Sequence, residues 1–271
     1  MDNQALGIIG AGKMGEALIK GLLSSAAFAK DKLVASEPDS GRRAALTSRC
    51  GVKVFAENEA VVSRAATVIL AVKPQLVDLV LEQLRDSFTP SHLLISIAAG
   101  VGLSRLRKPF SKPPRLIRVM PNACVMAQAG ASVICPDQGA TSQDEQLALN
   151  IFNSVGKAFI VKDEDLMDAV TGLSGSGPAY FFVVFEALSD AGVAQGLPRE
   201  LARDLAVQTA LGAAKLAQVS ELHLAQLKEV VTSPGGTTIA GLKMLERFSL
   251  RAAFMEAVEA ATKRSKELGQ D

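Results

Sequence analysis

The 271-residue sequence has very few aromatic side chains: tryptophan is absent, tyrosine occurs once, and aromatic residues make up 4% of the chain. Proteins that bind single-stranded nucleic acid commonly stack bases on aromatic side chains, so this scarcity argues against such a surface. An excess of charge is also missing, because 29 Lys and Arg residues face 28 Asp and Glu residues. The resulting net charge of +1 gives no electrostatic footprint for DNA or an anionic membrane. We therefore expect neither nucleic acid nor a membrane as a partner.

Cysteine and long apolar runs are scarce as well. Cys50, Cys124 and Cys135 form no CxxC pair and no spacing that suits zinc. Such scattered thiols are typical of a reducing compartment, and no metal site is predicted. The sequence contains no run of about 18 apolar residues and no basic amino-terminal region ahead of an apolar one, so neither a membrane span nor a targeting signal is expected. We expect a cytoplasmic protein.

Hydrophobic residues are plentiful at 48%, and in the first 160 residues they form short runs that alternate with helical stretches such as Gly15–Ser24 and Gln75–Arg85. Several of these runs lack polar alternation, as expected for strands that helices cover on both faces. This pattern predicts an α/β fold with an N-terminal Rossmann-type, doubly wound and mostly parallel sheet. The predicted strands are Leu6–Ile9, Leu33–Ser36, Val52–Phe55, Val68–Val72, Leu93–Ile97, Leu116–Met120, Ser132–Cys135 and Phe159–Val161.

The pattern changes after about residue 162, where helix-forming residues dominate and no convincing strand occurs between Glu164 and Leu268. Helix breaks are expected at Gly175–Pro178, Gly196–Pro198 and Ser233–Gly236. We therefore predict a dinucleotide-binding domain over residues 1–162 and an all-helical substrate and dimerisation domain over residues 163–271. Its apolar helical stretches carry more hydrophobic surface than such a small domain can easily bury, which favours a homodimer or a higher homo-oligomer.

The segment Gly10–Gly15 has the GxGxxG pattern, directly after a predicted strand and at the start of a predicted helix. Gly10 permits a tight turn, Gly12 lets a pyrophosphate approach the backbone, and Gly15 allows close packing of helix on strand. The helix start then offers free N–H groups to the phosphates. A glycine-rich turn without a ligand remains the alternative.

The residues after the second strand bear on the choice between NADPH and NADH. Ser36 ends this strand, Glu37 follows it, and Arg42 and Arg43 come shortly afterwards. A hydroxyl with a nearby guanidinium suits the 2′-phosphate of NADPH, which is the cofactor we expect to be preferred over NADH. Glu37 favours NADH if its side chain turns inward, and the two arginines fit the solvated start of a helix equally well.

Two further turns follow the fourth and fifth strands at the edge where ligands of such sheets lie, namely Ala71–Pro74 and Ala98–Gly100. Small side chains at Ala98–Gly100 let a nicotinamide ring approach the backbone, although both turns fit ordinary loop ends. In the helical half, Ser233–Gly236 forms a glycine loop ahead of a helix that begins with Thr237 and Thr238. Free N–H groups at such a start bind a carboxylate, while a capped helix start without a ligand is the alternative.

Six segments occur together and in order: Gly10–Gly15, Ala71–Pro74, Ser96–Gly100, Met120–Asn122, Gly172–Tyr180 and Ser233–Thr238. Through them the chain resembles the pyrroline-5-carboxylate reductase family over essentially its whole length. The resemblance implies transfer of a hydride from NAD(P)H to the C=N carbon of 1-pyrroline-5-carboxylate, giving L-proline in the final step of proline biosynthesis. It also implies a helical domain that interlocks with a partner's.

The motifs and the resemblance together indicate the site residues. The resemblance implies that Thr238 is catalytic and faces the ring nitrogen. The implied substrate-binding residues are Glu164, Ser233, Gly235, Gly236, Thr237 and Thr238. The cofactor-binding residues are Gly10, Ala11, Gly12, Lys13, Met14, Gly15, Ser36, Asn58, Ala71, Val72, Lys73, Pro74, Ala98, Ala99 and Gly100. Two departures from the family pattern are Leu224, where proline is common, and Glu37, where an uncharged residue is common.

The sequence leaves three alternative functions: a β-hydroxyacid dehydrogenase, another imine reductase, and a non-catalytic nucleotide-sensing module that binds a protein partner. Oxidation of an alcohol calls for a general base. The only histidines, His92 and His223, lie in no recognisable catalytic motif, and the chain has no asparagine after Asn153. Reduction of a protonated cyclic imine, which needs mainly positioning and a hydrogen-bond donor, therefore fits the sequence better.

Overall fold

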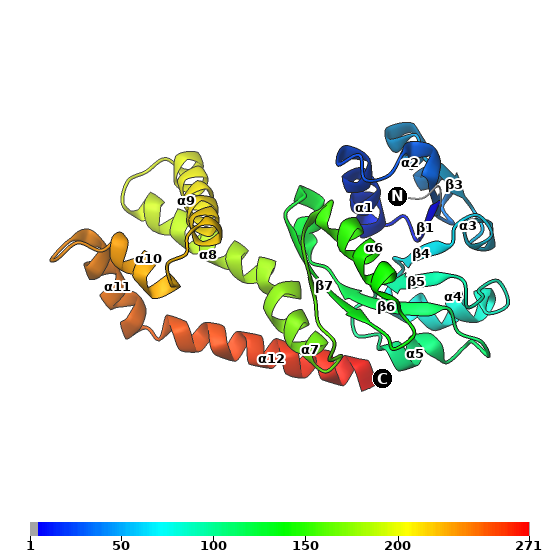
Figure 1. The fold of residues 1–271 in the computed structure, drawn as a ribbon. Helices are drawn as coiled ribbons and strands as arrows, with labels where there is room; N and C mark the ends of the chain where they lie inside the picture. The colour runs from blue at the N-terminus through cyan, green and yellow to red at the C-terminus, as the bar shows by residue number, and fades with distance from the viewer. Residues whose placement is uncertain (1–4, 271) are drawn as a thin grey trace. The chain divides into compact units, whose positions relative to one another are not determined.

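The computed structural model describes residues 5–270, which form two compact units (Figure 1). The first unit runs to Ser176 and also contains the carboxyl-terminal segment from Ala260, whereas the second unit is Gly177–Glu259. The domain boundary between residues 162 and 163 stays a prediction. No helix within residues 5–270 is long and apolar enough to cross a membrane.

One eight-stranded sheet organises the first unit, with the strand order β3-β2-β1-β4-β5-β6-β7-β8. All neighbouring strands are parallel except β6 and β7, which are antiparallel. The chain reverses its direction of strand addition between β1 and β4, so the carboxyl ends of these strands flank the crevice where ligands of doubly wound sheets bind. The strands are β1 (Leu6–Ile9), β2 (Leu33–Ser36), β3 (Lys53–Phe55), β4 (Thr67–Leu70), β5 (Leu93–Ser96), β6 (Arg115–Met120), β7 (Gly130–Pro136) and β8 (Gly156–Ile160).

Helices cover both faces of this sheet and create two separate cores, which confirms the predicted doubly wound fold. One core joins the sheet to α1, α2 and α6, and the other joins it to α3, α4 and α5. The strands between them are almost fully buried, which explains their continuous apolar runs. The helices are α1 (Lys13–Ser24), α2 (Ser40–Cys50), α3 (Glu59–Val62), α4 (Val77–Leu84), α5 (Leu103–Arg107) and α6 (Ser142–Asn153), with short 3₁₀ turns η1 (Lys30–Lys32), η2 (Pro74–Leu76) and η3 (Ala123–Ala127).

From residue 164 onward the described chain is helical, as predicted. Two of the predicted breaks separate helices: Gly196, with φ of +93°, lies between α8 and α9, and Gly235, with φ of +68°, precedes α11. At Gly175–Pro178 no loop occurs: the π-helical turn ends at Gly175 and α8 begins at Gly177. The elements are α7 (Leu166–Val170), the π-helical turn (Thr171–Gly175), α8 (Gly177–Ala194), α9 (Arg199–Val219), α10 (Leu224–Val230), α11 (Thr237–Arg247) and α12 (Leu250–Gln270).

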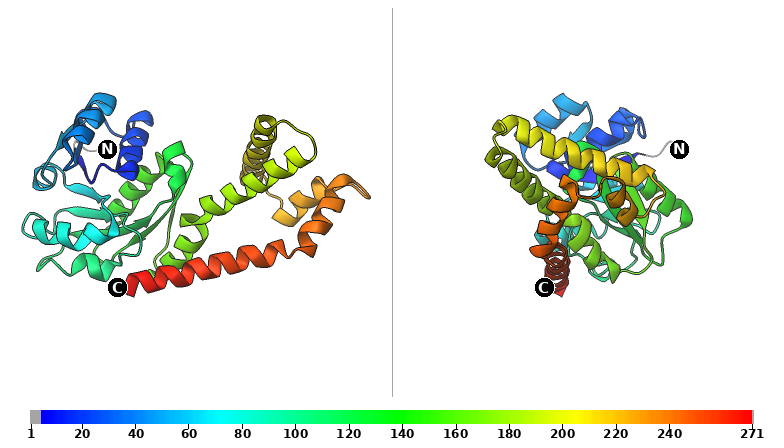
Figure 2. Two further views of the ribbon diagram at one scale, coloured as in Figure 1. Left: turned by 180° about the vertical axis from the view of Figure 1, so that it is seen from behind. Right: turned by 90° about the vertical axis from the view of Figure 1, so that its left-hand side faces the viewer.

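The last turns of α12 lie beside α7 in the first unit (Figures 1 and 2). The buried hydroxyl of Ser265 donates a hydrogen bond of 2.6 Å to Asp168 Oδ1 and ties the two helices together. Leu268 also contacts the turn after β5, because a Cβ at Gly100 would lie 3.7 Å from the Leu268 Cβ. The carboxyl-terminal segment is therefore an integral part of the unit that carries the sheet.

Candidate active site

The glycine turn after β1 has the shape that a dinucleotide requires. Gly10 has φ of +92°, and a Cβ there would lie 2.8 Å from the Ala71 carbonyl oxygen. A Cβ at Gly15 would overlap the Gly10 carbonyl oxygen. Around Gly12, by contrast, the only described atom within 4 Å of an added Cβ is a guanidinium nitrogen of Arg42, at 3.7 Å. The open space is thus at the glycine that a pyrophosphate approaches, and the packed positions are those that shape the turn.

The first turn of α1 begins directly beside this open space. Gly12 is the N-cap residue, and among the described residues no side chain caps the helix start. Its N–H groups and the positive end of the helix dipole therefore face the place expected for phosphates. Ala11 is buried, Met14 packs partly against the core, and Lys13 is exposed at the first helical position. The predicted cofactor residues Gly10–Gly15 accordingly form one cradle.

The end of β2 lies next to the cradle, because the Gly10 and Ala11 amides both donate to the Ser36 carbonyl oxygen at 3.1 Å. The Ser36 hydroxyl is buried and donates a 2.7 Å hydrogen bond to Asn58 Oδ1. The structure thus brings together Ser36 and Asn58, two predicted cofactor residues that are 22 positions apart. In this arrangement the serine hydroxyl supports the loop before α3 rather than facing open space.

The two arginines after β2 have different partners. Arg42 donates to the Ala11 carbonyl oxygen at 3.3 Å, and its Nε lies 3.8 Å from the buried carboxylate of Glu37. Arg43 instead donates to the Glu37 and Pro38 carbonyl oxygens, at 2.9 and 2.7 Å, and so holds the turn itself. Glu37 is therefore turned inward and paired with a cation, and Arg42 is the guanidinium that lies beside the glycine cradle.

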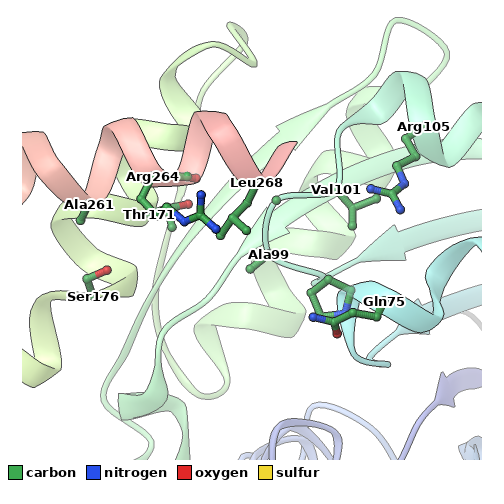
Figure 3. Close-up of a pocket in the computed structure, with 12 residues that line it drawn as sticks. Gln75, Ala99, Val101, Arg105, Thr171, Ser176, Ala261, Arg264 and Leu268 are labelled. Carbon is green, nitrogen blue, oxygen red and sulfur yellow. The ribbon is translucent and has the colours of Figure 1, made fainter. Parts of the chain in front are cut away.

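The turns after β4 and β5 border a cavity of about 600 Å³ (Figure 3). Pro74, Ala99 and Gly100 line it from the carboxyl edge of the sheet. Thr171 and Ser176 line it from the π-helical turn and its end, and the last turns of α12 add Arg264 and Leu268. Of the other predicted residues here, Ala98 is buried, Ala71 and Val72 are half-buried, and Lys73 is exposed at the start of η2. All predicted cofactor residues thus lie on one unit, along the carboxyl edge of its sheet.

Glu164 lies in the same unit, where its carboxylate is already engaged. Its Oε1 accepts hydrogen bonds of 2.8 Å from the Leu103 amide and from a guanidinium nitrogen of Arg118. The Arg118 side chain, on β6, is only 9% exposed. Glu164 thus ties the segment before α7 to β6 through Arg118 and to the start of α5 through Leu103. The predicted contact of Glu164 with the substrate stays a prediction. No role was predicted for Arg118, although an arginine within the apolar run of β6 was the available signal.

The predicted substrate loop belongs to the second unit. The Gly236 amide donates to the Ser233 carbonyl oxygen at 3.1 Å, which closes the loop, and a Cβ at Gly236 would overlap the Ser233 hydroxyl. Helix α11 begins at Thr237, and among the described residues no side chain caps it. Thr238 is the second residue of the helix, and no hydrogen bond of its hydroxyl occurs within residues 5–270. This start has the free N–H groups and hydroxyl that a small carboxylate ligand needs.

Comparison with known proteins now identifies the family. Residues 5–100 match the model of the NADP oxidoreductase, coenzyme F420-dependent family, and residues 164–268 match the model of pyrroline-5-carboxylate reductase dimerisation. A curated pyrroline-5-carboxylate reductase of Methanosarcina acetivorans is 46% identical over 270 residues, which is 100% of each chain. The chain belongs to the pyrroline-5-carboxylate reductase family. It is an NAD(P)H-dependent oxidoreductase.

Solved structures of this family share the fold. A pyrroline-5-carboxylate reductase from Coxiella burnetii superposes with a TM-score of 0.93 at 36% identity, covering 98% of this chain and 99% of the other. A pyrroline carboxylate reductase of Plasmodium falciparum, solved with NADP bound, gives a TM-score of 0.88 at 34% identity, covering 99% of both chains. The predicted resemblance and fold class are therefore confirmed at the level of the family.

Proposed function

We propose that this chain reduces the C=N bond of 1-pyrroline-5-carboxylate with a hydride from NAD(P)H and releases L-proline, which is the final step of proline biosynthesis. The observation that carries the proposal is the presence of two complementary elements in one chain of this family. A glycine cradle at Gly10–Gly15 suits a dinucleotide, and an uncapped helix start at Ser233–Thr238 suits a small carboxylate.

The cofactor, when bound, supplies the hydride that reduces the substrate. Gly12 and the first turn of α1 would hold its pyrophosphate, and the turns Ala71–Pro74 and Ala98–Gly100 would receive its nicotinamide end. Arg42 supports a preference for NADPH, since its guanidinium lies beside the cradle and also faces the Glu37 carboxylate, the group that would repel a 2′-phosphate.

In the proposed reaction the loop residues orient the substrate. Backbone amides around Gly236 and Thr237 hold the carboxylate, and the Thr238 hydroxyl bonds to the ring nitrogen. A cyclic imine is basic enough to arrive protonated near neutral pH. The hydride adds to the ring carbon while the C=N π pair moves to nitrogen, so no general base has to remove a proton. Orientation and hydrogen bonding therefore suffice.

We also propose a homodimer, or a higher homo-oligomer, formed through the helical domain and located in the cytoplasm. Helix α8 is apolar around its circumference, yet only Gly177 and Ser189 are buried within one chain. Phe181, Phe182 and Val183 are 59%, 64% and 64% exposed. Apolar surface of this extent calls for a partner copy, and the match of residues 164–268 to a dimerisation family supports the same assembly. The three free cysteines suit a reducing compartment.

The proposed reaction is tested by mixing purified protein with NADPH and 1-pyrroline-5-carboxylate. The loss of NADPH absorbance is followed, and the product is quantified by chromatography. We expect L-proline to form in the same molar amount as NADPH is consumed. A chain that leaves this substrate unchanged but oxidises 3-hydroxy acids with NADP⁺ would be a hydroxyacid dehydrogenase instead. Light scattering tests the assembly, since an active monomer at micromolar concentration contradicts the proposed dimer.

A further inference from the structure

The segment Met120–Asn122 and the segment Gly172–Tyr180 meet at the π-helical turn. Within this turn the Ser176 amide donates to the Thr171 carbonyl oxygen at 2.9 Å, five residues back. Pro178 has no N–H, so the carbonyl of Ser174, four residues before it, lacks its usual helical donor. That donor is replaced by a side chain from the end of β6, because Asn122 Nδ2 donates to the Ser174 carbonyl oxygen at 3.1 Å.

Asn122 is held firmly in this orientation. It is 8% exposed, and its Oδ1 accepts hydrogen bonds of 3.2 Å from the Cys124 and Ala131 amides. With the oxygen committed to two donors, the amide nitrogen must face the Ser174 carbonyl. Nearby, a Cβ at Gly175 would lie 2.6 Å from the Met120 Cε, so only glycine fits against the methionine without a shift. The end of β6 therefore contacts the turn at two points.

The geometry of this turn decides which side chains face the cavity at the edge of the sheet. Thr171 and Ser176, at the start and just after the end of the turn, both line it together with Ala99 and Gly100 (Figure 3). The Thr171 hydroxyl is committed to the Met167 carbonyl oxygen at 2.8 Å. The Ser176 hydroxyl makes no hydrogen bond within the part of the chain that the structure describes. Ser176 is thus the hydroxyl that the turn offers to a ligand.

A π-helical turn contains one residue more than an α-helical turn. Return to an α-helical register would rotate the residues on one side of the turn relative to those on the other by about 100°. The Ser176 hydroxyl would then face a different direction, although the fold around it would be unchanged. The bond between Asn122 and Ser174 opposes this change, because Asn122 is fixed by the Cys124 and Ala131 amides and a rotated Ser174 carbonyl would turn away from it.

We propose that Asn122 is a positioning residue for the cofactor: through the Ser174 carbonyl it maintains the π-helical turn, which presents the Ser176 hydroxyl to the nicotinamide end of NAD(P)H. This inference rests on the proposed function, because it assigns the cavity beside Ala99 and Gly100 to the nicotinamide. Asn122 itself is buried behind the turn and acts through it.

The test separates stability from binding. Asn122→Ala leaves the Ser174 carbonyl without its donor, so we expect a lower melting temperature and a weaker affinity for NADPH, by about 5- to 10-fold for one hydrogen bond lost at the nicotinamide end. In the double variant Asn122→Ala/Pro178→Ala, residue 178 regains an N–H that can bond to Ser174 in the α-helical register. We expect this variant to recover much of the melting temperature but not the NADPH affinity.

Two controls define the effect. Asn122→Asp keeps an acceptor for the Cys124 and Ala131 amides but replaces the donor with a charged oxygen that repels the Ser174 carbonyl, so its loss of affinity should be at least as large. Asn150→Ala removes an amide whose Oδ1 accepts from Gln146 on the surface of α6, and it should change nothing. The fragment 2′,5′-ADP, which has no nicotinamide, should bind all variants as tightly as the wild type.

Each result has a defined meaning. Recovery of NADPH affinity together with melting temperature in the double variant would overturn the proposal, because Asn122 would then support only the fold. An equal loss of affinity for 2′,5′-ADP would overturn it as well, since the defect would not be confined to the nicotinamide end. These binding measurements need no turnover. A wild type that binds NADPH but does not reduce 1-pyrroline-5-carboxylate would refute the proposed function and leave this comparison intact.

Discussion

Replacement of Thr238 by valine removes the hydroxyl while keeping the branched shape of the side chain. Thr238 is the second residue of α11, after the N-cap Gly236, and its hydroxyl has no hydrogen-bond partner among residues 5–270. The folded chain therefore loses no internal bond in this variant. We expect the free energy of unfolding to stay within about 0.5 kcal/mol of the wild type, as for most surface substitutions.

Turnover should respond very differently. The proposed hydrogen bond between the Thr238 hydroxyl and the ring nitrogen orients the substrate, and loss of one such bond costs about 1–3 kcal/mol. This corresponds to a decrease of roughly 5- to 150-fold in kcat/KM for 1-pyrroline-5-carboxylate. Thr238→Ser keeps the hydroxyl on the same carbon and should retain most of the activity. The affinity for NADPH should be unchanged in both variants, because the cofactor is held by the other unit.

Three measurements on the same preparations decide the matter: kcat/KM from NADPH oxidation, NADPH affinity from fluorescence titration, and thermal unfolding. Normal turnover by Thr238→Val would refute the role assigned to the hydroxyl. Equal losses in the valine and serine variants would also refute it, because serine preserves the hydrogen bond. A marked fall in melting temperature would identify Thr238 as a residue that stabilises the helix start rather than the substrate.

Three further predictions concern the cofactor unit. Gly12→Ala should abolish tight NADPH binding with little change in stability. Gly15→Ala should instead destabilise the fold by about 1–3 kcal/mol, because its Cβ would overlap the backbone. Titration with NADPH and thermal unfolding measure this contrast. Arg42→Ala should weaken NADPH binding more than NADH binding in parallel titrations, and equal losses would show that the guanidinium does not meet the 2′-phosphate. Hydrogen bonds from Arg105 lower the pKa of Asp78. Because the pair is exposed, it should stabilise the fold at neutral pH by less than about 1 kcal/mol relative to Asp78→Asn. In urea titrations this difference in the free energy of unfolding should disappear as the pH falls through the lowered pKa of Asp78 in the folded protein.

Local patterns predicted most of the fold because the strands are buried on both faces and therefore read as apolar runs. The eighth strand was predicted at Phe159–Val161 but begins at Gly156, since it lies at the edge of the sheet and its exposed residues alternate with half-buried ones. The helix expected at Gln75–Arg85 is divided into η2 and α4, because the turn that follows Pro74 is a 3₁₀ turn. In both cases the element was present and only its bounds depended on its neighbours.

Part of the candidate site can likewise be predicted from the sequence, and part of it cannot. The glycine cradle is visible in the sequence because each glycine has a local reason to be there. The ion pair between Arg118 and Glu164 spans 46 residues, and no pattern along the chain indicates it. The glycines and proline at Gly175–Pro178 favour a break, whereas in the structure a π-helical turn over Thr171–Gly175 leads into α8 at Gly177. The Ser174 carbonyl in this turn accepts a hydrogen bond from Asn122, 52 residues away, which only the tertiary structure reveals.

The return of α12 to the sheet-bearing unit has a consequence for how the protein is made. The cavity beside Ala99 and Gly100 is walled in part by Arg264 and Leu268, and Ser265 anchors this wall to Asp168. A ribosome translates the whole of Gly177–Glu259 between Ser176 and this wall. The wall can therefore be completed only after Gly177–Glu259 has been synthesised, whereas every residue of the glycine cradle is translated earlier, so the two parts of the candidate cofactor site become available at different times.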